Sequence, residues 1–205
     1  MEQVFVANPK GGCGKTTIAA QLAGYYASRG DSVVLVDHDP QRSSSDWLSM
    51  RPSSCHKIIL ERVRGKSNVD IDNADVKIHD LPATWTLACM EGYVQSGDYI
   101  LVPILASPTD IRAAFRFIMS LHREGVMEWP VKIGFIANRT RRNTRYYQVL
   151  AEFVDRIELP LISTLRDTQN YVQVMDKGLS LFDIPQGRVR KDLDEWQPVI
   201  DWLKT

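Results

Sequence analysis

The stretch Asn8–Thr17, N-P-K-G-G-C-G-K-T-T, decides the fold of this chain of 205 residues. An apolar run, V-F-V-A, precedes it, and a helical pattern follows from Thr16 to Arg29. Glycines let backbone N–H groups turn inward around phosphate oxygens, and a helix N-terminus adds partial positive charge. The usual phosphate-loop pattern, G-x-x-x-x-G-K-[ST], requires glycine where Pro9 stands. The context still predicts a phosphate-binding loop, with a second lysine, Lys10, that the usual pattern does not explain.

The residues of this loop have distinct expected roles. Lys15 is expected to reach the β- and γ-phosphates, and the hydroxyl of Thr16 is placed to ligate Mg²⁺. Cys13 is interpreted as a small side chain tolerated beside the phosphates, the alternative being an exposed reactive thiol. The predicted nucleotide-binding residues are Gly11, Gly12, Cys13, Gly14, Lys15, Thr16 and Thr17.

Short apolar runs alternate with helical patterns along the rest of the chain. This alternation predicts one doubly wound α/β domain over residues 1–205, a mostly parallel sheet with helices on both faces. Residues 53–75 show no legible pattern. Strands are expected at the runs beginning at Val4, Ser32, Val76, Tyr99, Val131 and Leu159. Helices are expected near Thr16–Arg29, Thr84–Gln95, Thr109–Arg123, Asn143–Arg156 and Thr168–Lys177.

Carboxylates follow two of the predicted strands. Asp37 and Asp39 are two residues apart and so lie on the same side of an extended chain. One can orient or deprotonate an attacking water, and the other can hold Mg²⁺, although an Asp-Pro turn after a strand is an equal alternative. Asp80 ends a third strand, where a metal-facing carboxylate is expected, but strands often end in aspartate. Ligands of open α/β sheets bind beyond the carboxyl ends of the strands, which agrees with these positions.

Three segments, N-P-K-G-G-C-G-K-T-T, V-D-H-D-P-Q and H-D-L-P-A, together resemble the deviant Walker A ATPases of the ParA/MinD type. The resemblance implies Mg²⁺-dependent hydrolysis of ATP to ADP and phosphate, weak alone and stimulated by a partner. It implies that Lys10 crosses an ATP-sandwich homodimer to the partner's phosphates. The implied catalytic residues are Lys10, Lys15 and Asp39, and the implied metal site contains Thr16, Asp37 and Asp80. Asn138 in F-I-A-N-R would contact adenine, unless it is a turn residue that ends a strand.

Arginines crowd into the segment N-R-T-R-R-N-T-R, which has no acidic neighbour in sequence. The chain has no net charge, so any nucleic-acid surface must be a local patch. The segment predicts non-specific contacts with DNA phosphates, with a solvated basic surface or a role at the nucleotide as alternatives. A second small cluster precedes the tail: Arg188, Arg190 and Lys191. The predicted DNA-binding residues are Arg139, Arg141, Arg142 and Arg145.

Composition and termini narrow the class of protein. The scattered cysteines, Cys13, Cys55 and Cys89, are interpreted as free thiols of a reducing cytoplasm. We expect no signal peptide, no membrane-spanning run and no helix-turn-helix extension before the first strand. The tail from Lys191 is expected to pack on the core, because its acidic polar side does not suit a MinD-like membrane tail.

The resulting expectation is a cytoplasmic, nucleoid-associated ATPase that forms a homodimer on ATP, binds DNA and is released by a ParB-like or cargo-adaptor partner. Plasmid partition is the expected role. The alternatives are a protein cargo, such as a carboxysome or chemosensory cluster, a MinD-like membrane-associated ATPase, and a metabolic ATP-dependent ligase.

Overall fold

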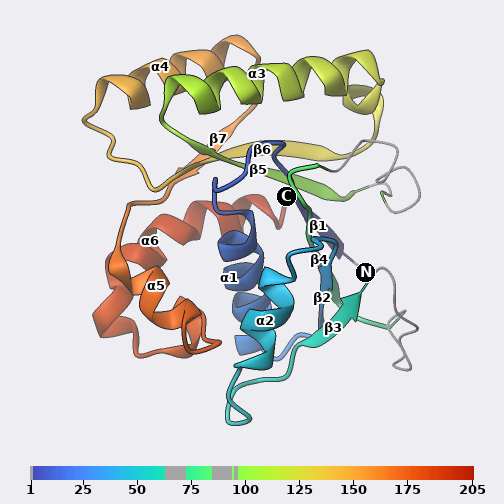
Figure 1. Cartoon of the computed structure of the whole chain (residues 1–205), viewed down its shortest axis with the longest axis vertical. Helices are drawn as coiled ribbons and strands as arrows, with labels where there is room; N and C mark the ends of the chain where they lie inside the picture. Colours follow the sequence, from blue (N-terminus) through green and yellow to red (C-terminus); the bar gives the residue numbers. More distant parts are fainter. Residues whose placement is uncertain (1, 63–72, 85–93, 95–96) are drawn as a thin grey trace.

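The computed structural model describes residues 2–62, 73–84, 94 and 97–205, and these form one parallel sheet. Its strand order is β3-β2-β4-β1-β5-β6-β7, and every recorded pairing is parallel (Figure 1). The doubly wound α/β fold predicted from the alternating pattern is confirmed. The strands are β1 Glu2–Val6, β2 Val33–Asp37, β3 Ile59–Arg62, β4 Val76–Asp80, β5 Tyr99–Leu105, β6 Lys132–Asn138 and β7 Leu161–Thr164.

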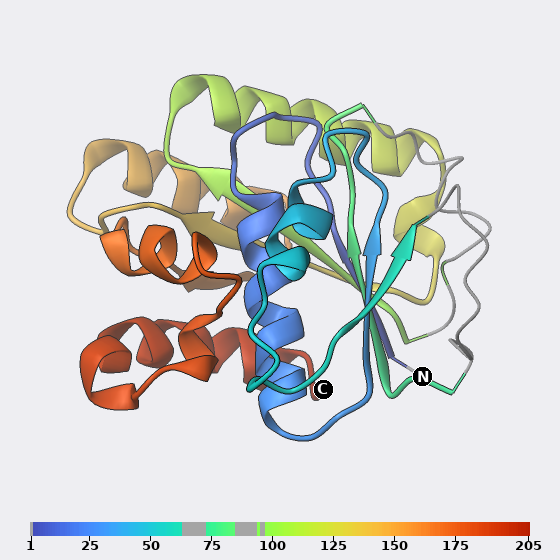
Figure 2. The ribbon, with the colours of Figure 1, turned by 60° about the horizontal axis from the view of Figure 1, so that its bottom comes forward.

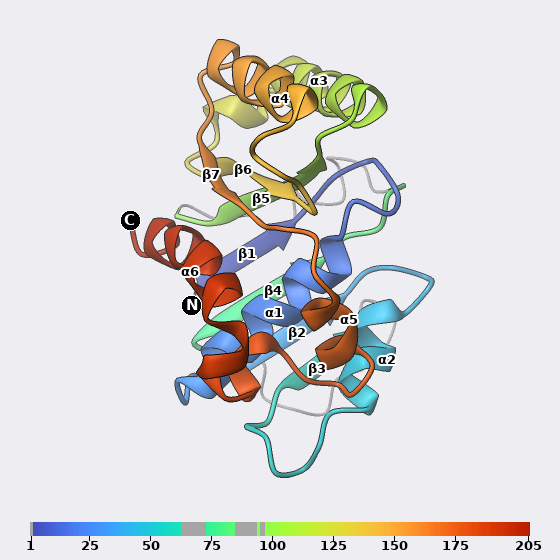
Figure 3. The ribbon, with the colours of Figure 1, turned by 90° about the vertical axis from the view of Figure 1, so that its left-hand side faces the viewer.

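Helices cover both faces of the sheet. Helices α3 and α4 lie on one face, whereas α1, α2, α5 and α6 lie on the other (Figures 1 and 3). The helices are α1 Lys15–Ser28, α2 Ser43–Ser49, α3 Pro108–Arg123, α4 Arg145–Arg156, α5 Gln169–Met175 and α6 Gln186–Trp202. Two 3₁₀ turns, η2 Val126–Glu128 and η3 Leu181–Asp183, complete the described elements.

The core divides between the two faces because side chains alternate along each strand. In β1, Val4 and Val6 belong to the cluster with α1, and Phe5 belongs to the cluster with α3 and α4. Helix α1 runs along the sheet with α2 beside it, as Figure 2 shows. Since α1 is buried on most of its circumference, it holds the end of the phosphate loop rigidly against the sheet.

The structure confirms six predicted strands and four predicted helices, with ends shifted by a few residues. The fifth predicted helix, Thr84–Gln95, falls mostly on residues 85–93 and 95, which lie outside the described residues, as does Cys89. Strand β3 and helix α2 were not predicted. The expectation for the tail is confirmed, because α6 buries Trp196, Val199 and Ile200. No helix in the described ranges combines the length and apolar character that crossing a membrane requires.

Candidate functional site

Parallel register brings the predicted motifs to one edge of the sheet. Asp37 at the end of β2 pairs with Asp80 at the end of β4, and Asp80 pairs in turn with Val6 of β1. The phosphate loop leaves β1 directly after this pair. The structure therefore assembles the loop and both carboxylates at the carboxyl edge, as the sequence predicted.

The shape of the loop is held by Asn8, which the sequence reading did not single out. Its buried side chain accepts a hydrogen bond from the Lys10 N–H at 2.8 Å and donates to the Pro103 carbonyl at 2.7 Å. The loop ends at Gly14, whose φ of 97° precedes α1 without a side-chain cap. The N-terminal N–H groups of α1 thus face the loop, as an anion site requires.

The two lysines of the loop differ in their surroundings. Lys15 is buried, and its ammonium donates to the carbonyls of Asn8 at 3.0 Å and Lys10 at 3.1 Å. Lys10 is only partly buried, and the described residues provide no hydrogen bond or ion pair for its ammonium. Lys15 therefore points into its own loop, whereas Lys10 is available for a group outside it.

Cys13 is fully buried and donates from Sγ to the Lys10 carbonyl at 3.2 Å. Burial raises the pKa of this thiol. The exposed, reactive thiol considered as an alternative is wrong, and the interpretation as a small side chain inside the loop fits. Cys55 is a free thiol, as expected.

Asn138 at the end of β6 is attached to the loop from the other side. Its amide donates to the Cys13 carbonyl at 2.8 Å, and its side-chain oxygen accepts the Arg139 N–H at 3.0 Å. A Cβ at Gly14 would overlap with this amide, so only glycine fits there. The structure brings Asn138 to the site, and its contact with adenine stays a prediction.

Asp37 and Asp39 have different surroundings. Asp37 is buried, and it accepts hydrogen bonds from the N–H groups of Asp39 and Ser45, each at 3.0 Å, and from the Ser45 hydroxyl. It thereby fixes the loop after β2 and the first turn of α2. Asp39 is only partly buried and accepts from the Gln41 N–H at 2.9 Å. Asp39 is the carboxylate that solvent reaches, which suits its expected role at the attacking water.

Asp80 is buried with neither carboxylate oxygen hydrogen-bonded within the described part of the chain, and the buried hydroxyl of Ser44 also lacks a partner there. Burial raises the pKa of Asp80 to about 7, and Asp37 adds to this. The hydroxyls of Thr16 and Ser44 and the ammonium of Lys15 act in the opposite direction. The two hydroxyls are thus near Asp80, although neither meets the geometry of a hydrogen bond.

This arrangement fits Mg²⁺. A buried carboxylate without donors is costly, and a hard cation with oxygen ligands removes that cost. Thr16, Asp37 and Asp80 are the predicted metal residues that lie here. Among the described residues no three His, Cys, Asp or Glu side chains are placed so that they could hold a metal ion, so the ion would depend on hydroxyls, water and phosphate as well.

Residues 4–181 match the model of the CobQ/CobB/MinD/ParA nucleotide-binding domain. The chain belongs to this family. It is 26% identical over 203 residues to the Maintenance of carboxysome distribution protein A of Halothiobacillus neapolitanus, covering 96% of this chain and 93% of that protein.

Two solved structures share the ParA/MinD-type fold. A Cyanothece McdA variant in complex with ATP superposes with a TM-score of 0.72 at 17% identity, covering 97% of this chain and 96% of that one. A putative plasmid partition protein of Borrelia burgdorferi bound to AMPPNP gives a TM-score of 0.70 at 14% identity, with 98% of each chain covered. At these identities the likeness establishes the fold alone.

The residues that follow or precede the carboxylates of this ParA/MinD-type site belong to a largely buried polar chain that the sequence did not reveal. His38 Nε2 lies 2.9 Å from His79 Nδ1, His79 Nε2 lies 3.2 Å from Gln3 Oε1, and Gln3 donates to Asp98 at 3.0 Å. Burial lowers the pKa of His38 to about 4, and burial next to His38 places the pKa of His79 well below its usual value. Both rings are therefore neutral at pH 7, and each donates its Nε2 proton along the chain.

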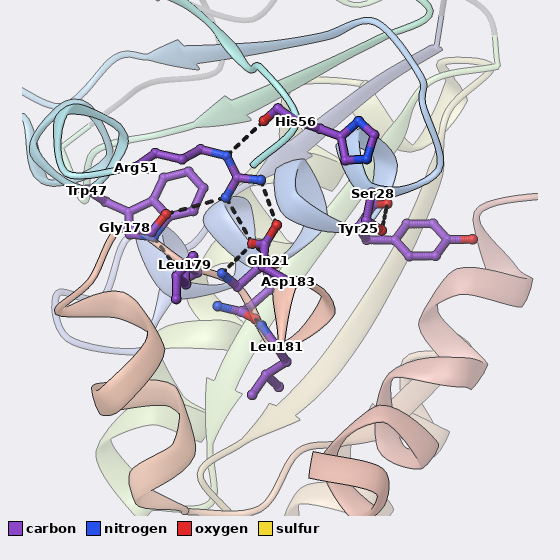
Figure 4. Close-up of polar contacts among 11 residues, drawn as sticks. Gln21, Tyr25, Ser28, Trp47, Arg51, His56, Gly178, Leu179, Leu181 and Asp183 are labelled. Atoms are coloured by element: carbon purple, nitrogen blue, oxygen red, sulfur yellow. Dashed lines mark hydrogen bonds and ion pairs between the residues drawn. The ribbon is translucent and has the colours of Figure 1, made fainter. Parts of the chain in front are cut away.

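Helix α2 is fastened on its far side by an ion pair, shown in Figure 4. The Arg51 guanidinium donates to the two carboxylate oxygens of Asp183 at 2.7 and 2.9 Å and to the Gly178 carbonyl at 3.3 Å. The Trp47 indole donates to the Leu179 carbonyl at 3.1 Å. We call these five residues the Arg51 clamp. It joins α2 to the segment between α5 and α6.

The predicted DNA-binding arginines follow β6 at the same edge of the sheet. No acidic residue stands beside these arginines in sequence, but Arg139 Nε lies 3.3 Å from Asp167 Oδ1, after β7. The expectation of a cluster without salt bridges is therefore wrong for Arg139. Arg141, Arg142 and Arg145 are exposed, and none of them belongs to a salt bridge recorded for the described residues. Three of the four guanidinium groups thus remain available for a ligand.

Proposed function

We propose that this protein is an ATP-operated switch that dimerises on ATP, binds DNA without sequence preference and is released when a partner stimulates hydrolysis. The contrast between the two lysines carries the proposal. Lys15 is bound within its own loop, but Lys10 is not, so Lys10 suits a phosphate bound to a second copy of the chain. A cation supplied in trans makes dimerisation depend on ATP.

Different residues of the site have different roles in the proposed hydrolysis of ATP. Lys15 and the N-terminus of α1 neutralise charge on the phosphates, and Asp39 orients the attacking water. Thr16, Asp37 and Asp80 would hold Mg²⁺, which would supply positive charge against the negative charge of the phosphates. Within the described residues the Asp39 carboxylate accepts one recorded hydrogen bond, from the Gln41 N–H, and no recorded side-chain hydrogen bond fixes it as a base, so intrinsic hydrolysis is expected to be slow. A fast turnover without any partner would contradict this proposal.

Variants of the two lysines test the dimer. Lys15→Ala should abolish ATP binding, because it removes the cation at the centre of the loop. Lys10→Ala should keep most of the ATP affinity of the monomer and lose ATP-dependent dimerisation. Nucleotide titration and analytical ultracentrifugation with a non-hydrolysable ATP analogue separate the two effects, and an equal loss of ATP affinity in both variants would contradict the role in trans.

DNA binding is expected from Arg141, Arg142 and Arg145, and a dimer would offer about six such contacts. Affinity should then fall by about 10³-fold or more between 50 and 200 mM salt. The test is binding of a random-sequence duplex with no nucleotide, ADP, ATP or the ATP analogue. Binding only with ATP or the analogue, lost in R141A/R142A, supports the proposal.

The matched control for this experiment is R123A/R156A. It removes two other exposed arginines, at the C-terminal ends of α3 and α4, and the same total charge. Its binding should stay close to that of the unmodified protein. An equal loss in both double variants would show a general charge effect, and no binding in any nucleotide state would remove the DNA step altogether.

The cargo is proposed to be a plasmid, in a nucleoid-associated cytoplasmic cycle with a ParB-like partner. A protein compartment is the second candidate, favoured by the nearly full-length similarity to a carboxysome distribution protein. Deleting the gene for this protein distinguishes the two candidate cargoes. Plasmid loss at division supports the first, whereas clustered compartments with normal plasmid inheritance support the second. A membrane-bound cycle is disfavoured because the apolar side chains of α6 are buried in the core.

A further inference from the structure

Three consecutive serines begin α2, and the structure gives each a different environment. Ser43 is exposed, and the Ser45 hydroxyl donates to Asp37. Ser44 between them has no exposed surface, and its hydroxyl has no hydrogen-bond partner in the described ranges. A hydroxyl buried without a partner lowers the stability of the fold, so alanine would be the more stable residue in a purely structural role.

The position of Ser44 is set by its neighbour. The Asp37 carboxylate accepts both the N–H and the hydroxyl of Ser45, which holds the first turn of α2 at the end of β2. Asp37 is paired in register with Asp80 at the end of β4. Ser44, which precedes Ser45 in the chain, is thereby held in the first turn of α2 beside the paired ends of β2 and β4.

Two buried groups without hydrogen-bond partners in the described ranges, Ser44 Oγ and the Asp80 carboxylate, therefore lie at the same edge of the sheet, where Thr16 stands in the first turn of α1. All three offer oxygen atoms, and oxygen is what Mg²⁺ and its bound waters accept as a neighbour. The cost of leaving these oxygens unpaired is removed if a hydrated cation lies among them.

We propose that Ser44 is a residue of the magnesium site, contributing its hydroxyl oxygen as a direct ligand of the ion, together with Thr16 and Asp80. This inference rests on the proposed function, since it assumes that the nucleotide arrives with Mg²⁺. It adds a residue of α2 to a site otherwise built from the phosphate loop and strand ends. Metal binding then involves the first turn of helix α2 directly.

The test measures the affinity of a fluorescent ATP analogue with Mg²⁺ and with EDTA. For Ser44→Ala we expect unchanged affinity in EDTA and an apparent Mg²⁺ affinity, measured with the nucleotide bound, reduced by about 10-fold. Ser43→Ala is the matched control, because it makes the same chemical change one residue away on an exposed position. It should behave like the unmodified protein.

A second variant tests the proposal even if Ser44→Ala fails to fold. Ser44→Cys retains a side chain of similar size and replaces a hard oxygen by sulfur, so Cd²⁺ should support nucleotide binding better relative to Mg²⁺ than in the unmodified protein. An unchanged preference between the two metals would contradict the proposal, as would a Ser44→Ala variant that loses affinity equally with Mg²⁺ and EDTA.

Different results would contradict the proposed function and the assignment of Ser44. If the unmodified protein binds the nucleotide equally well with Mg²⁺ and EDTA, the metal-dependent switch itself is wrong. If the unmodified protein depends on Mg²⁺ and Ser44→Ala shows the same dependence, only the assignment of Ser44 is wrong.

Discussion

Helix α2 lies between two buried polar clusters that differ in how well their atoms are paired. In the Arg51 clamp, Asp183 accepts from Arg51 and also from the N–H and hydroxyl of Ser180, at 2.7 and 2.6 Å. On the other side, Asp80 and Ser44 have no such donors in the described residues. Buried polar groups are normally paired, so the first cluster serves stability and the second indicates a ligand.

The electrostatics of the two carboxylates follow this difference. Burial raises the pKa of Asp183, but hydrogen bonds from Arg51 and Ser180 outweigh it and hold the pKa below its usual value. At Asp80 burial dominates and the pKa rises to about 7. Desolvation acts on both carboxyl groups, and the donors decide the sign of the net shift.

The largest expected effect comes from breaking the paired cluster. Arg51→Ala leaves Asp183 buried without its cation and should lower the free energy of unfolding by about 3–5 kcal/mol. Urea denaturation at pH 7.5 measures the change. Arg123→Ala, at an exposed position, should change it by less than about 0.5 kcal/mol. A comparably small effect of Arg51→Ala would show that the clamp does not stabilise the fold.

The opposite sign is expected at the unpaired cluster. The pKa of Asp80 is higher in the folded than in the unfolded chain, so ionisation opposes folding increasingly as pH rises from about 4 through 7. Without nucleotide and in EDTA, Asp80→Asn should therefore raise the free energy of unfolding at pH 8 by about 2–4 kcal/mol. It should also weaken Mg²⁺-dependent nucleotide binding.

Urea denaturation of both proteins across pH 4–8 checks this prediction. The stabilisation by Asp80→Asn should be nearly gone at pH 4, where the carboxyl is protonated in the folded protein and about half protonated in the unfolded chain. A loss of stability at pH 8 would mean that Asp80 is paired in the folded protein, and the contrast between the clusters would fail.

The smallest expected effect concerns His38. Its pKa falls to about 4 in the folded protein, so the unfolded chain binds more protons between pH 4 and 6.5. The contribution of His38 to the free energy of unfolding is fully present above about pH 6.5 and is lost as the pH falls. At pH 5 this loss amounts to about 2 kcal/mol. His38→Gln should reduce this loss.

The slope is best measured in the Asp80→Asn background, because Asp80 contributes the opposite pH dependence in the same range. Denaturation at pH 5 and pH 7 with and without His38→Gln isolates the histidine. Identical slopes would show that the polar chain through His79 and Gln3 accepts a proton without cost.

The sequence predicted elements with strong periodicity and missed those without it. Strand β3 is short, has two charged residues among four and lies at the edge of the sheet. Helix α2 reads S-S-S-D-W-L-S, a poor set of helix formers. It is held instead by the buried Trp47 and by Asp37. Both elements depend on contacts with segments outside themselves, which propensity does not record.

By itself, the sequence determined the α/β class, the phosphate loop and the carboxylates that meet at the carboxyl edge. These features could be predicted because the carboxyl ends of neighbouring parallel strands lie at the same edge of the sheet, so residues that end those strands come together. Only the tertiary structure decided the partners of individual side chains: Lys15 on its own loop, Arg139 on Asp167, and Arg51 on Asp183, 132 positions away along the chain. Such pairings, and the unpaired Ser44, depend on distances in space that local sequence patterns do not encode.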